Sequence, residues 1–253
     1  MEIFPIAHFR SPLKSKFGIP RQSGLVGELA GSIVFEPDYR HEEALRGLED
    51  FDYLWLVWEF SANRAHKGAA HKGSDPAVRP ASHEGLTPCE PKDSLTVRPP
   101  RLGGNRRLGV FATRSPFRPN PLGLSCVRLD RIERDAKLGP VIHVLGADLM
   151  DGTPIYDIKP YVAYADSHPG ARSGFVDQTE WRELQVEIPD AVANRLPAGE
   201  LPALRRLLAL DPRPRYHDDA GRVYGMPFGC WDVRFRVSDG VVTVVDCVET
   251  VAP

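Results

Sequence analysis

Short runs of apolar residues, separated by glycine, proline and charged clusters, recur along the first half of the chain. They predict β-strands at Glu2–Phe9, Glu28–Phe35 and Phe51–Phe60, and the last has so little polar alternation that we expect both its faces to be buried. Apolar residues spaced as in a buried helical stripe predict one helix over Tyr39–Leu48. No strand is followed by a long helix, so this pattern favours an antiparallel barrel or sandwich.

Further strand signals follow in the middle of the chain. Leu108–Thr113 and Leu122–Leu129 are short strand-like runs. Arg128–Glu133 and Val141–Leu145 predict a strand pair joined by a turn at Lys137-Leu138-Gly139-Pro140.

The pattern changes after Ala165–Gly174, which has the composition of a linker. Trp181–Ile188 alternates like a half-exposed strand, and Pro189–Leu210 predicts two short helical pieces. Two apolar runs then flank Ser238-Asp239-Gly240, which is a hairpin signature.

These patterns predict a mainly β protein of two domains. We expect an antiparallel β domain over residues 1–168 and a small α+β domain over residues 175–253. Ser61–Leu95 interrupts the first domain and contains AHKG twice, which predicts a mobile insertion of low complexity. The histidines of this segment have no metal-ligand spacing, so we expect no metal site there.

Composition narrows the class of protein. The chain has 253 residues, 42% of them hydrophobic and 26% charged, with a formal net charge of −2, so any nucleic-acid contact must use local patches. The N-terminus lacks the pattern of a signal peptide, and no apolar run approaches the roughly 20 residues needed to span a bilayer. The four cysteines are scattered, which argues against a zinc site or a disulfide framework. We therefore expect a cytoplasmic protein with reduced thiols and no membrane partner.

A basic stretch, Thr96–Leu129, organises the sequence. It holds seven arginines and no Asp or Glu, and prolines and glycines shape its backbone. Arginines on rigid loops between strands suit an anionic ligand, although a solvated surface loop explains the composition equally well.

An acidic stretch, Asp148–Tyr161, follows. It holds three carboxylates, Asp148, Asp151 and Asp157, beside an Asp-Gly turn. From the pattern alone, a plain hairpin with polar tips is slightly favoured over a site. No G-x-G-x-x-G follows a strand anywhere, which argues against a Rossmann cofactor site.

Four pieces of sequence occur in a fixed order: PRQ (Pro20–Gln22), TVRPPRLGGN (Thr96–Asn105), GVFATRSPFRPNPLGLS (Gly109–Ser125) and DLMDGTPIYDIKPY (Asp148–Tyr161). In this order they resemble the TrmO family of tRNA methyltransferases. The resemblance extends to DPRPRY (Asp211–Tyr216) and so covers nearly the whole chain.

The resemblance implies S-adenosylmethionine binding on an N-terminal antiparallel β-barrel. It implies methylation of the N6 nitrogen of threonylcarbamoyladenosine, next to the anticodon of certain threonine tRNAs. It also implies a homodimer with the cofactor near the subunit interface. The positions matching the family's cofactor contacts are Pro20, Arg21, Gln22, Ser61, Ala62, Arg114, Leu124, Leu149, Met150, Asp151 and Gly152.

The sequence departs from the family at two places. Relatives often carry His-Gln where this chain has Ser61-Ala62, so a contact made by those side chains is lost or replaced. The insertion at Ser61–Leu95 is also longer than usual for the family.

The chemistry requires positioning and a proton acceptor. The acceptor N–H is a poor nucleophile because its lone pair is delocalised, so nitrogen, methyl and sulfur must be aligned. A carboxylate within hydrogen-bond reach can take the proton. Asp151 and Asp157 are the candidates, with Asp151 first because it lies in the expected cofactor segment; a structural hydrogen-bonding role for either is equally consistent.

The substrate offers phosphates and a threonyl carboxylate to cations, and splayed bases to aromatic rings. The candidate RNA contacts are Arg98, Arg118, Tyr161, Arg213 and Arg215, the last two from the small domain. Arg114 can also pair with an anion. Phe117 is a further candidate for stacking, whereas we expect Phe111 to pack in the core.

Two other classes of function remain open. The chain could be a cofactor- or RNA-binding module without turnover, which the Ser61-Ala62 change allows. It could also be a phosphate-ligand enzyme in which Asp148, Asp151 and Asp157 hold a metal ion, and that reading predicts Mg²⁺ dependence.

Overall fold

The computed structural model describes residues 2–61, 95–99, 106–179, 182–213, 219 and 221–250. The expected insertion lies, apart from Ser61 and Leu95, outside the described residues, as do Ala62 and Arg215. The chain forms two compact units, residues 1–58 with 124–253 and residues 59–123, and each is described separately.

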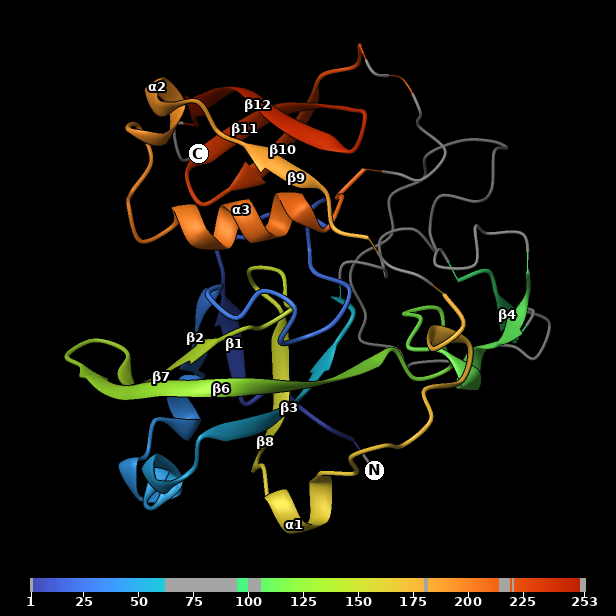
Figure 1. The fold of residues 1–253 in the computed structure, drawn as a ribbon. Coiled ribbons are helices and arrows are strands. Elements are labelled where there is room, and N and C mark those ends of the chain that lie inside the picture. The colour runs from blue at the N-terminus through green and yellow to red at the C-terminus, as the bar shows by residue number, and fades with distance from the viewer. Residues whose placement is uncertain are drawn as a thin grey trace, which may run out of the picture. The chain divides into compact units, whose positions relative to one another are not determined.

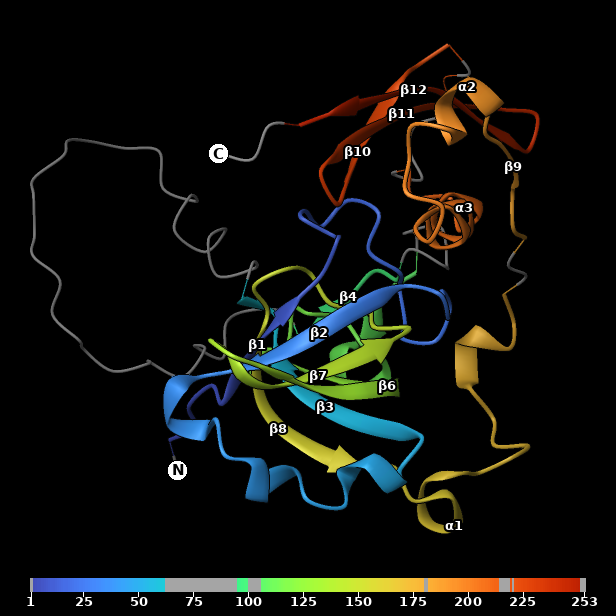
Figure 2. The ribbon, with the colours of Figure 1, turned by 90° about the vertical axis from the view of Figure 1, so that its left-hand side faces the viewer.

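Six strands form one sheet whose order, β1-β2-β7-β6-β3-β8, closes on itself as a barrel (Figures 1 and 2). β1 pairs antiparallel with both β2 and β8, and β7 pairs antiparallel with both β2 and β6. The expectation of a mainly β fold is therefore confirmed. The strands are β1 (Ala7–Arg10), β2 (Ala30–Phe35), β3 (Tyr53–Glu59), β6 (Leu122–Asp135), β7 (Gly139–Leu145) and β8 (Pro154–Pro160).

The predicted strand pair in the middle of the chain is confirmed. β6 and β7 pair from Arg128↔Leu145 to Asp135↔Gly139, and Gly139 has φ +71° at the turn. Local alternation and turn residues were sufficient to fix this hairpin.

β3 differs from its prediction, because it is not buried on both faces. Leu54, Leu56 and Trp58 point into the core with 0%, 0% and 6% exposure, while Tyr53 is 44% exposed. Large aromatic residues on the outer face hid the period-two alternation that a barrel strand requires.

The helix predicted over Tyr39–Leu48 is wrong. Three short 3-10 helices replace it: η1 (Pro37–Tyr39), η2 (Glu42–Leu45) and η3 (Leu48–Asp50). Gly47 has φ +84°, a left-handed conformation that interrupts a continuous helix. Only Leu45 is buried in this segment, so the apolar spacing has no long core face to cover.

In the unit of residues 59–123, β4 (Thr96–Val97) pairs antiparallel with β5 (Leu108–Gly109). The strand expected at Leu108–Thr113 ends at Gly109, and a 3-10 helix, η6 (Val110–Ala112), follows it.

The C-terminal segment forms a second, four-stranded sheet with the order β10-β11-β12-β9 (Figure 1). The hairpin expected around Ser238-Asp239-Gly240 is confirmed, with positive φ at Asp239 and Gly240. The strands are β9 (Gln185–Glu187), β10 (Tyr224–Phe228), β11 (Trp231–Ser238) and β12 (Val241–Glu249). The two expected helical pieces are α2 (Asp190–Ala193) and α3 (Leu201–Ala209), and the connection after the barrel contains α1 (Ala163–Asp166) and η7 (Gly174–Val176).

The core of the C-terminal sheet also takes in the loop between β1 and β2. Leu13, Val26 and Leu29 of this loop belong to the same buried cluster as the leucines of α3, with Phe17, Ile19 and Leu25 packed against it. Two backbone carbonyls of the loop accept hydrogen bonds from this segment: Gly229 N–H donates to Pro12 O at 2.7 Å, and Arg206 Nε to Leu25 O at 3.2 Å. The loop that carries Pro20–Gln22 is thus packed on the C-terminal sheet.

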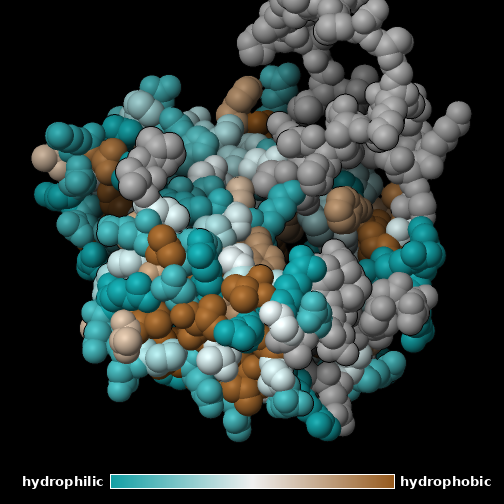
Figure 3. Space-filling model, turned by 90° about the horizontal axis from the view of Figure 1, so that it is seen from above, coloured by the Kyte–Doolittle hydropathy of each residue, from teal (hydrophilic) through white to brown (hydrophobic). Residues whose placement is uncertain are grey.

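The surface seen from above is mostly hydrophilic, with apolar areas between the polar ones (Figure 3). Among the described residues, no helix is long and apolar enough to cross a membrane.

Candidate functional site

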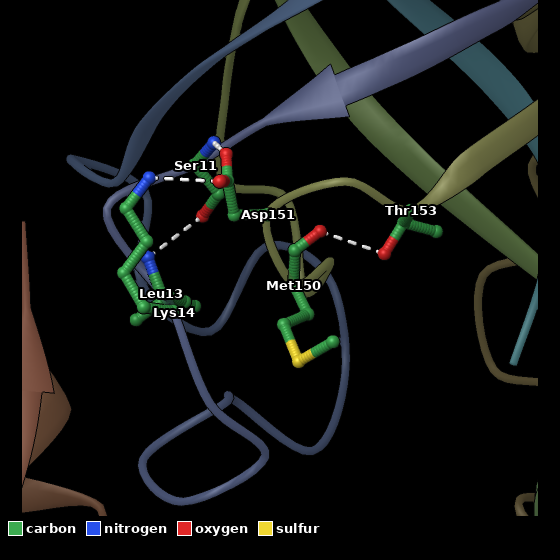
Figure 4. Close-up of polar contacts among 6 residues, drawn as sticks. All are labelled: Ser11, Leu13, Lys14, Met150, Asp151 and Thr153. Carbon is green, nitrogen blue, oxygen red and sulfur yellow. Dashed lines mark hydrogen bonds and ion pairs between the residues drawn. The ribbon is translucent and has the colours of Figure 1, made fainter. Parts of the chain in front are cut away.

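The Asp-Gly turn before β8 is fastened to the loop after β1 through Asp151 (Figure 4). One Asp151 carboxylate oxygen accepts the Ser11 backbone N–H at 2.9 Å, and the other accepts Lys14 Nζ at 2.8 Å. The Asp151 backbone N–H donates to Leu13 O at 2.9 Å. Both oxygens of this carboxylate are therefore engaged in holding residues 11–14.

The same turn is fixed from its other side. Gly152 has φ +75°, and its N–H donates to Phe9 O at 2.8 Å. The buried Thr153 hydroxyl donates to Met150 O at 2.7 Å (Figure 4). A Cβ added at Gly152 would meet no atom within 4 Å, so open space borders the turn at this residue.

The two predicted cofactor segments of the barrel loops are connected by backbone contacts. Pro20 is buried, while Arg21 and Gln22 are half-buried. Just after them, Gly24 N–H donates to Gly146 O at 2.8 Å, which ties this loop to the chain leading into Leu149–Gly152. Leu149 is fully buried and Met150 half-buried.

A cleft of about 1000 Å³ adjoins the Asp151 contacts. Its lining includes Arg10, Ser11, Lys14 and Asp151, together with Gly199, Glu200, Ala203 and residues 227–230. The cleft brings cations and carboxylates together at the end of the barrel that holds the Asp-Gly turn.

Two linked hydrogen bonds join β3, β6 and the segment before the Asp-Gly turn. Trp58 Nε1 donates to Ser125 Oγ at 2.9 Å, and Ser125 Oγ donates to Asp148 Oδ1 at 2.5 Å. Ser125 is 1% exposed and Trp58 is 6% exposed. Sequence reasoning missed this chain; the signal was a serine at an inward position of β6, between the buried Gly123 and Val127.

Two predicted cofactor positions lie close in sequence to these hydrogen-bonded residues. Leu124 points outward from β6 and is 57% exposed, and Ser61 is half-buried.

Asp157, the second candidate base, lies on β8. Its carboxylate accepts the Ile158 backbone N–H at 2.9 Å and forms an ion pair with Lys159 at 3.0 Å. Its side chain is 46% exposed, so this pair is a solvated one on the barrel wall.

Asp148, Asp151 and Asp157 have different partners and do not converge. Among the described residues, no group of three His, Cys, Asp or Glu side chains is placed to hold a metal ion. The phosphate-enzyme alternative, for which these three carboxylates could have supplied a metal site, therefore gains no support from the described residues.

The described part of the 59–123 unit exposes both arginines and phenylalanines. Arg98 and Arg114 are exposed, and Arg118 Nη1 donates to Thr113 O at 3.2 Å. Phe111 and Phe117 are 72% and 70% exposed, so the expectation that Phe111 packs in the core is wrong. The reason is η6, which starts at Val110 and buries that residue instead.

Tyr161, a predicted RNA contact, lies in an aromatic cluster on the barrel. Its ring is 6.0 Å from Tyr53 and 6.2 Å from Trp55, centroid to centroid. Trp55 Nε1 donates to Asp166 at 3.1 Å, and Val162 N–H to the same carboxylate at 2.8 Å. These two hydrogen bonds lower the pKa of Asp166 below its usual value, and the bond from Val162 contributes more than the bond from Trp55.

Arg213 is held by its neighbour in sequence. Its guanidinium forms two hydrogen bonds with the Asp211 carboxylate, at 2.8 and 3.0 Å, and its side chain is 15% exposed. Asp211 itself has φ +51°. Arg215, its predicted companion, lies outside the described residues.

The chain is a mainly β protein with a closed sheet, and its sequence has no Rossmann motif. Comparison with known proteins identifies its family. The model of the tRNA-methyltransferase O N-terminal domain matches residues 8–167, and that of the TrmO C-terminal domain matches residues 182–250. The chain belongs to the TrmO family.

The relatives are similar along nearly the whole chain. A tRNA (adenine(37)-N6)-methyltransferase of Escherichia coli (strain K12) is 39% identical over 245 residues, which cover 92% of this chain and 92% of that protein. A putative S-adenosylmethionine-dependent methyltransferase, RcsF, of Pseudomonas aeruginosa is 39% identical over 240 residues, covering 91% of this chain and 89% of that protein. The crystal structure of TrmO from Pseudomonas aeruginosa superposes with a TM-score of 0.71 at 30% identity, covering 98% of each chain.

Proposed function

We propose that this chain is an S-adenosylmethionine-dependent methyltransferase that methylates the N6 nitrogen of adenine 37 in tRNA. The observation that carries the proposal is the 39% identity to the Escherichia coli tRNA (adenine(37)-N6)-methyltransferase over 92% of both proteins. The finer proposal is that the acceptor is threonylcarbamoyladenosine in threonine tRNA. The enzyme works in the cytoplasm as a homodimer.

The residues present fit S-adenosylmethionine. Arg21 and Arg114 are suited to its carboxylate, and the exposed Leu124 to the apolar face of its adenine. Open space at Gly152 leaves room for a ligand against the backbone of the turn. When bound, the cofactor supplies an electrophilic methyl group on a positively charged sulfur.

We assign the cofactor site to Pro20–Gln22, Ser61, Ala62, Arg114, Leu124 and Leu149–Gly152. The Asp151 contacts fix residues 11–14 and 149–152 relative to one another, which supports the positioning that methyl transfer needs. The barrel over residues 1–168 is the catalytic domain in this proposal, and residues 175–253 form the domain that contacts tRNA.

The general base remains a prediction with Asp151 and Asp157 as candidates. Each oxygen of Asp151 already accepts one hydrogen bond and keeps a further lone pair that could accept the N6 proton. Asp157 is likewise paired with Lys159 on the exposed barrel wall. Both geometries support the structural role that the sequence left open.

For tRNA, the arginines and exposed phenylalanines of the 59–123 unit make the main surface. Arg98, Arg114 and Arg118 are suited to phosphates, and Phe111 and Phe117 to stacking on unpaired bases of the anticodon loop. Tyr161, Arg213 and Arg215 are proposed as further contacts.

Methyl transfer tests this function directly. The purified chain is incubated with labelled S-adenosylmethionine and total tRNA from a strain lacking the family's enzyme, in parallel with tRNA lacking the threonylcarbamoyl group. We expect label only on the threonylcarbamoyl-modified tRNA. Label on both would contradict the finer substrate, whereas cofactor binding by calorimetry without any label would favour the binding module without turnover.

A further inference from the structure

We propose that Trp58, Ser125 and Asp148 form a positioning unit that sets the spacing of three cofactor segments. None of the three is among the predicted contacts. The inference rests on the proposed function, because it concerns how the proposed cofactor site is held.

Each of the three hydrogen-bonded residues lies close in sequence to a segment of the proposed cofactor site. Ser125 directly follows Leu124, and Asp148 directly precedes Leu149–Gly152. Trp58 stands three residues before Ser61. The three segments come from positions up to 90 residues apart (58 to 148), and the two hydrogen bonds join the strands or loops that lead into them.

The chemistry of the three groups gives the chain a direction. An indole Nε1 can only donate, so the Ser125 hydroxyl accepts from Trp58 and directs its own proton to Asp148. A hydroxyl donating to a carboxylate is the stronger kind of hydrogen bond, and 2.5 Å is at the short end of its range. Because Ser125 and Trp58 are buried, water has little access to the hydrogen bond between them, whereas the Asp148 carboxylate is half-buried.

Stability alone does not explain a serine and a carboxylate at this place. Most other buried side chains on the same strands are apolar, such as Leu54, Leu56 and Val127, each 0% exposed, and Glu59 at the end of β3 is the exception. Apolar residues at all three positions could pack without leaving polar groups to satisfy. Fixed hydrogen bonds between these residues, however, hold the segments that carry them at one distance from each other. Hydrogen bonds to the residues that contact a ligand have the same effect in other binding sites.

The test compares Ser125→Ala, which breaks both hydrogen bonds, with Asp148→Asn, which keeps an acceptor oxygen for the serine. Val141→Ala in β7 serves as a control that trims a buried barrel side chain outside this chain of hydrogen bonds. Cofactor dissociation constants are measured by calorimetry on the full chain, melting temperatures by circular dichroism, and KM values for cofactor and tRNA by methyl transfer.

We expect Ser125→Ala to raise the cofactor dissociation constant and KM about 10-fold or more, by loss of positioning. The KM for tRNA should stay within about 2-fold, and Asp148→Asn should stay within about 3-fold of the native affinity because its acceptor is retained. Trp58→Phe, which removes only the first donor, should fall between the two variants, and it carries the test if Ser125→Ala does not fold.

Three outcomes would overturn the proposal. Native cofactor affinity in both Ser125→Ala and Trp58→Phe would show that these hydrogen bonds do not position the cofactor site. An equal loss of affinity in Val141→Ala would show a general effect of stability. Absence of cofactor binding by the native chain would remove the proposed function and this inference together, and is distinguished from the first two because no variant is involved.

Discussion

The barrel and the C-terminal sheet of this protein have differently composed interiors. The C-terminal cluster is built from leucine, valine, phenylalanine and other apolar side chains, with Tyr224 and Cys247 its most polar members. All buried polar or charged side chains found among the described residues lie before residue 160: Ser11, Glu59, Ser125 and Thr153.

The positions of these polar residues explain the difference. Ser11 contributes its backbone N–H to Asp151, and Thr153 follows Gly152. Ser125 follows Leu124, and Glu59 precedes Ser61 by two residues. Buried polarity therefore accompanies the proposed cofactor segments, while the C-terminal interior contributes apolar burial.

The largest expected effect on stability comes from the apolar interior. Leu208→Ala, at a fully buried position of α3, should cost about 2–5 kcal/mol of unfolding free energy, measured by urea titration. Below the unfolding transition, cofactor affinity should change by less than about 2-fold, since lost packing there removes no group from the site. If Leu208→Ala weakened cofactor binding as well as stability, the C-terminal interior and the cofactor site would not be separate in function.

Gly18→Ala tests the β1–β2 loop, which carries Pro20–Gln22 and also packs into the C-terminal core. Gly18 has φ +89°, and a Cβ there would clash with the buried Met226, whose Cγ would be 2.9 Å away. We expect a loss of about 1–3 kcal/mol by urea titration, with weaker cofactor binding because the strained loop carries Pro20–Gln22.

Gly27→Ala is the matched control in the same loop. A Cβ at Gly27 would meet nothing within 4 Å, and its φ is not left-handed. It should leave stability and cofactor affinity nearly unchanged. Weakened binding in both variants would mean that any change in this loop disturbs the site, without a role for the Met226 contact.

The smallest perturbation is chemical labelling of native thiols. Burial raises the pKa of Cys247 to about 11, whereas Cys230 is exposed. Because the thiolate is the reactive form, iodoacetamide at pH 8 should modify Cys230 well before Cys247, and raising the pH toward 11 should narrow the gap in the folded protein. Peptide mass spectrometry gives both rates; comparable rates at pH 8 would contradict a tightly packed apolar interior.

The sequence predicted most accurately the elements that depend on residues adjacent in sequence. The β6–β7 pair and the hairpin at Ser238-Asp239-Gly240 follow from alternation and turn residues alone. The Tyr39–Leu48 helix failed because a helical stripe forms only where a core face awaits it, and Gly47 adopts a left-handed conformation instead.

Within the site, the sequence located segments but not the contacts between them. The resemblance picked out Leu149–Gly152, yet the Ser11–Asp151 bond joins residues 140 positions apart and the Ser125–Asp148 bond residues 23 apart. Such pairs depend on barrel register, which no local pattern carries. Exposure of Phe111 likewise depended on where β5 ends.

The packing of the β1–β2 loop also bears on truncation. Leu13, Val26 and Leu29 are each at most 1% exposed because the C-terminal segment covers them. A fragment ending after the barrel would present these three side chains to water, forfeiting about 1.5–3 kcal/mol for each. The loop holding Pro20–Gln22 would then lose the surface on which it rests, so a soluble, cofactor-competent short form would require polar replacements at those three positions.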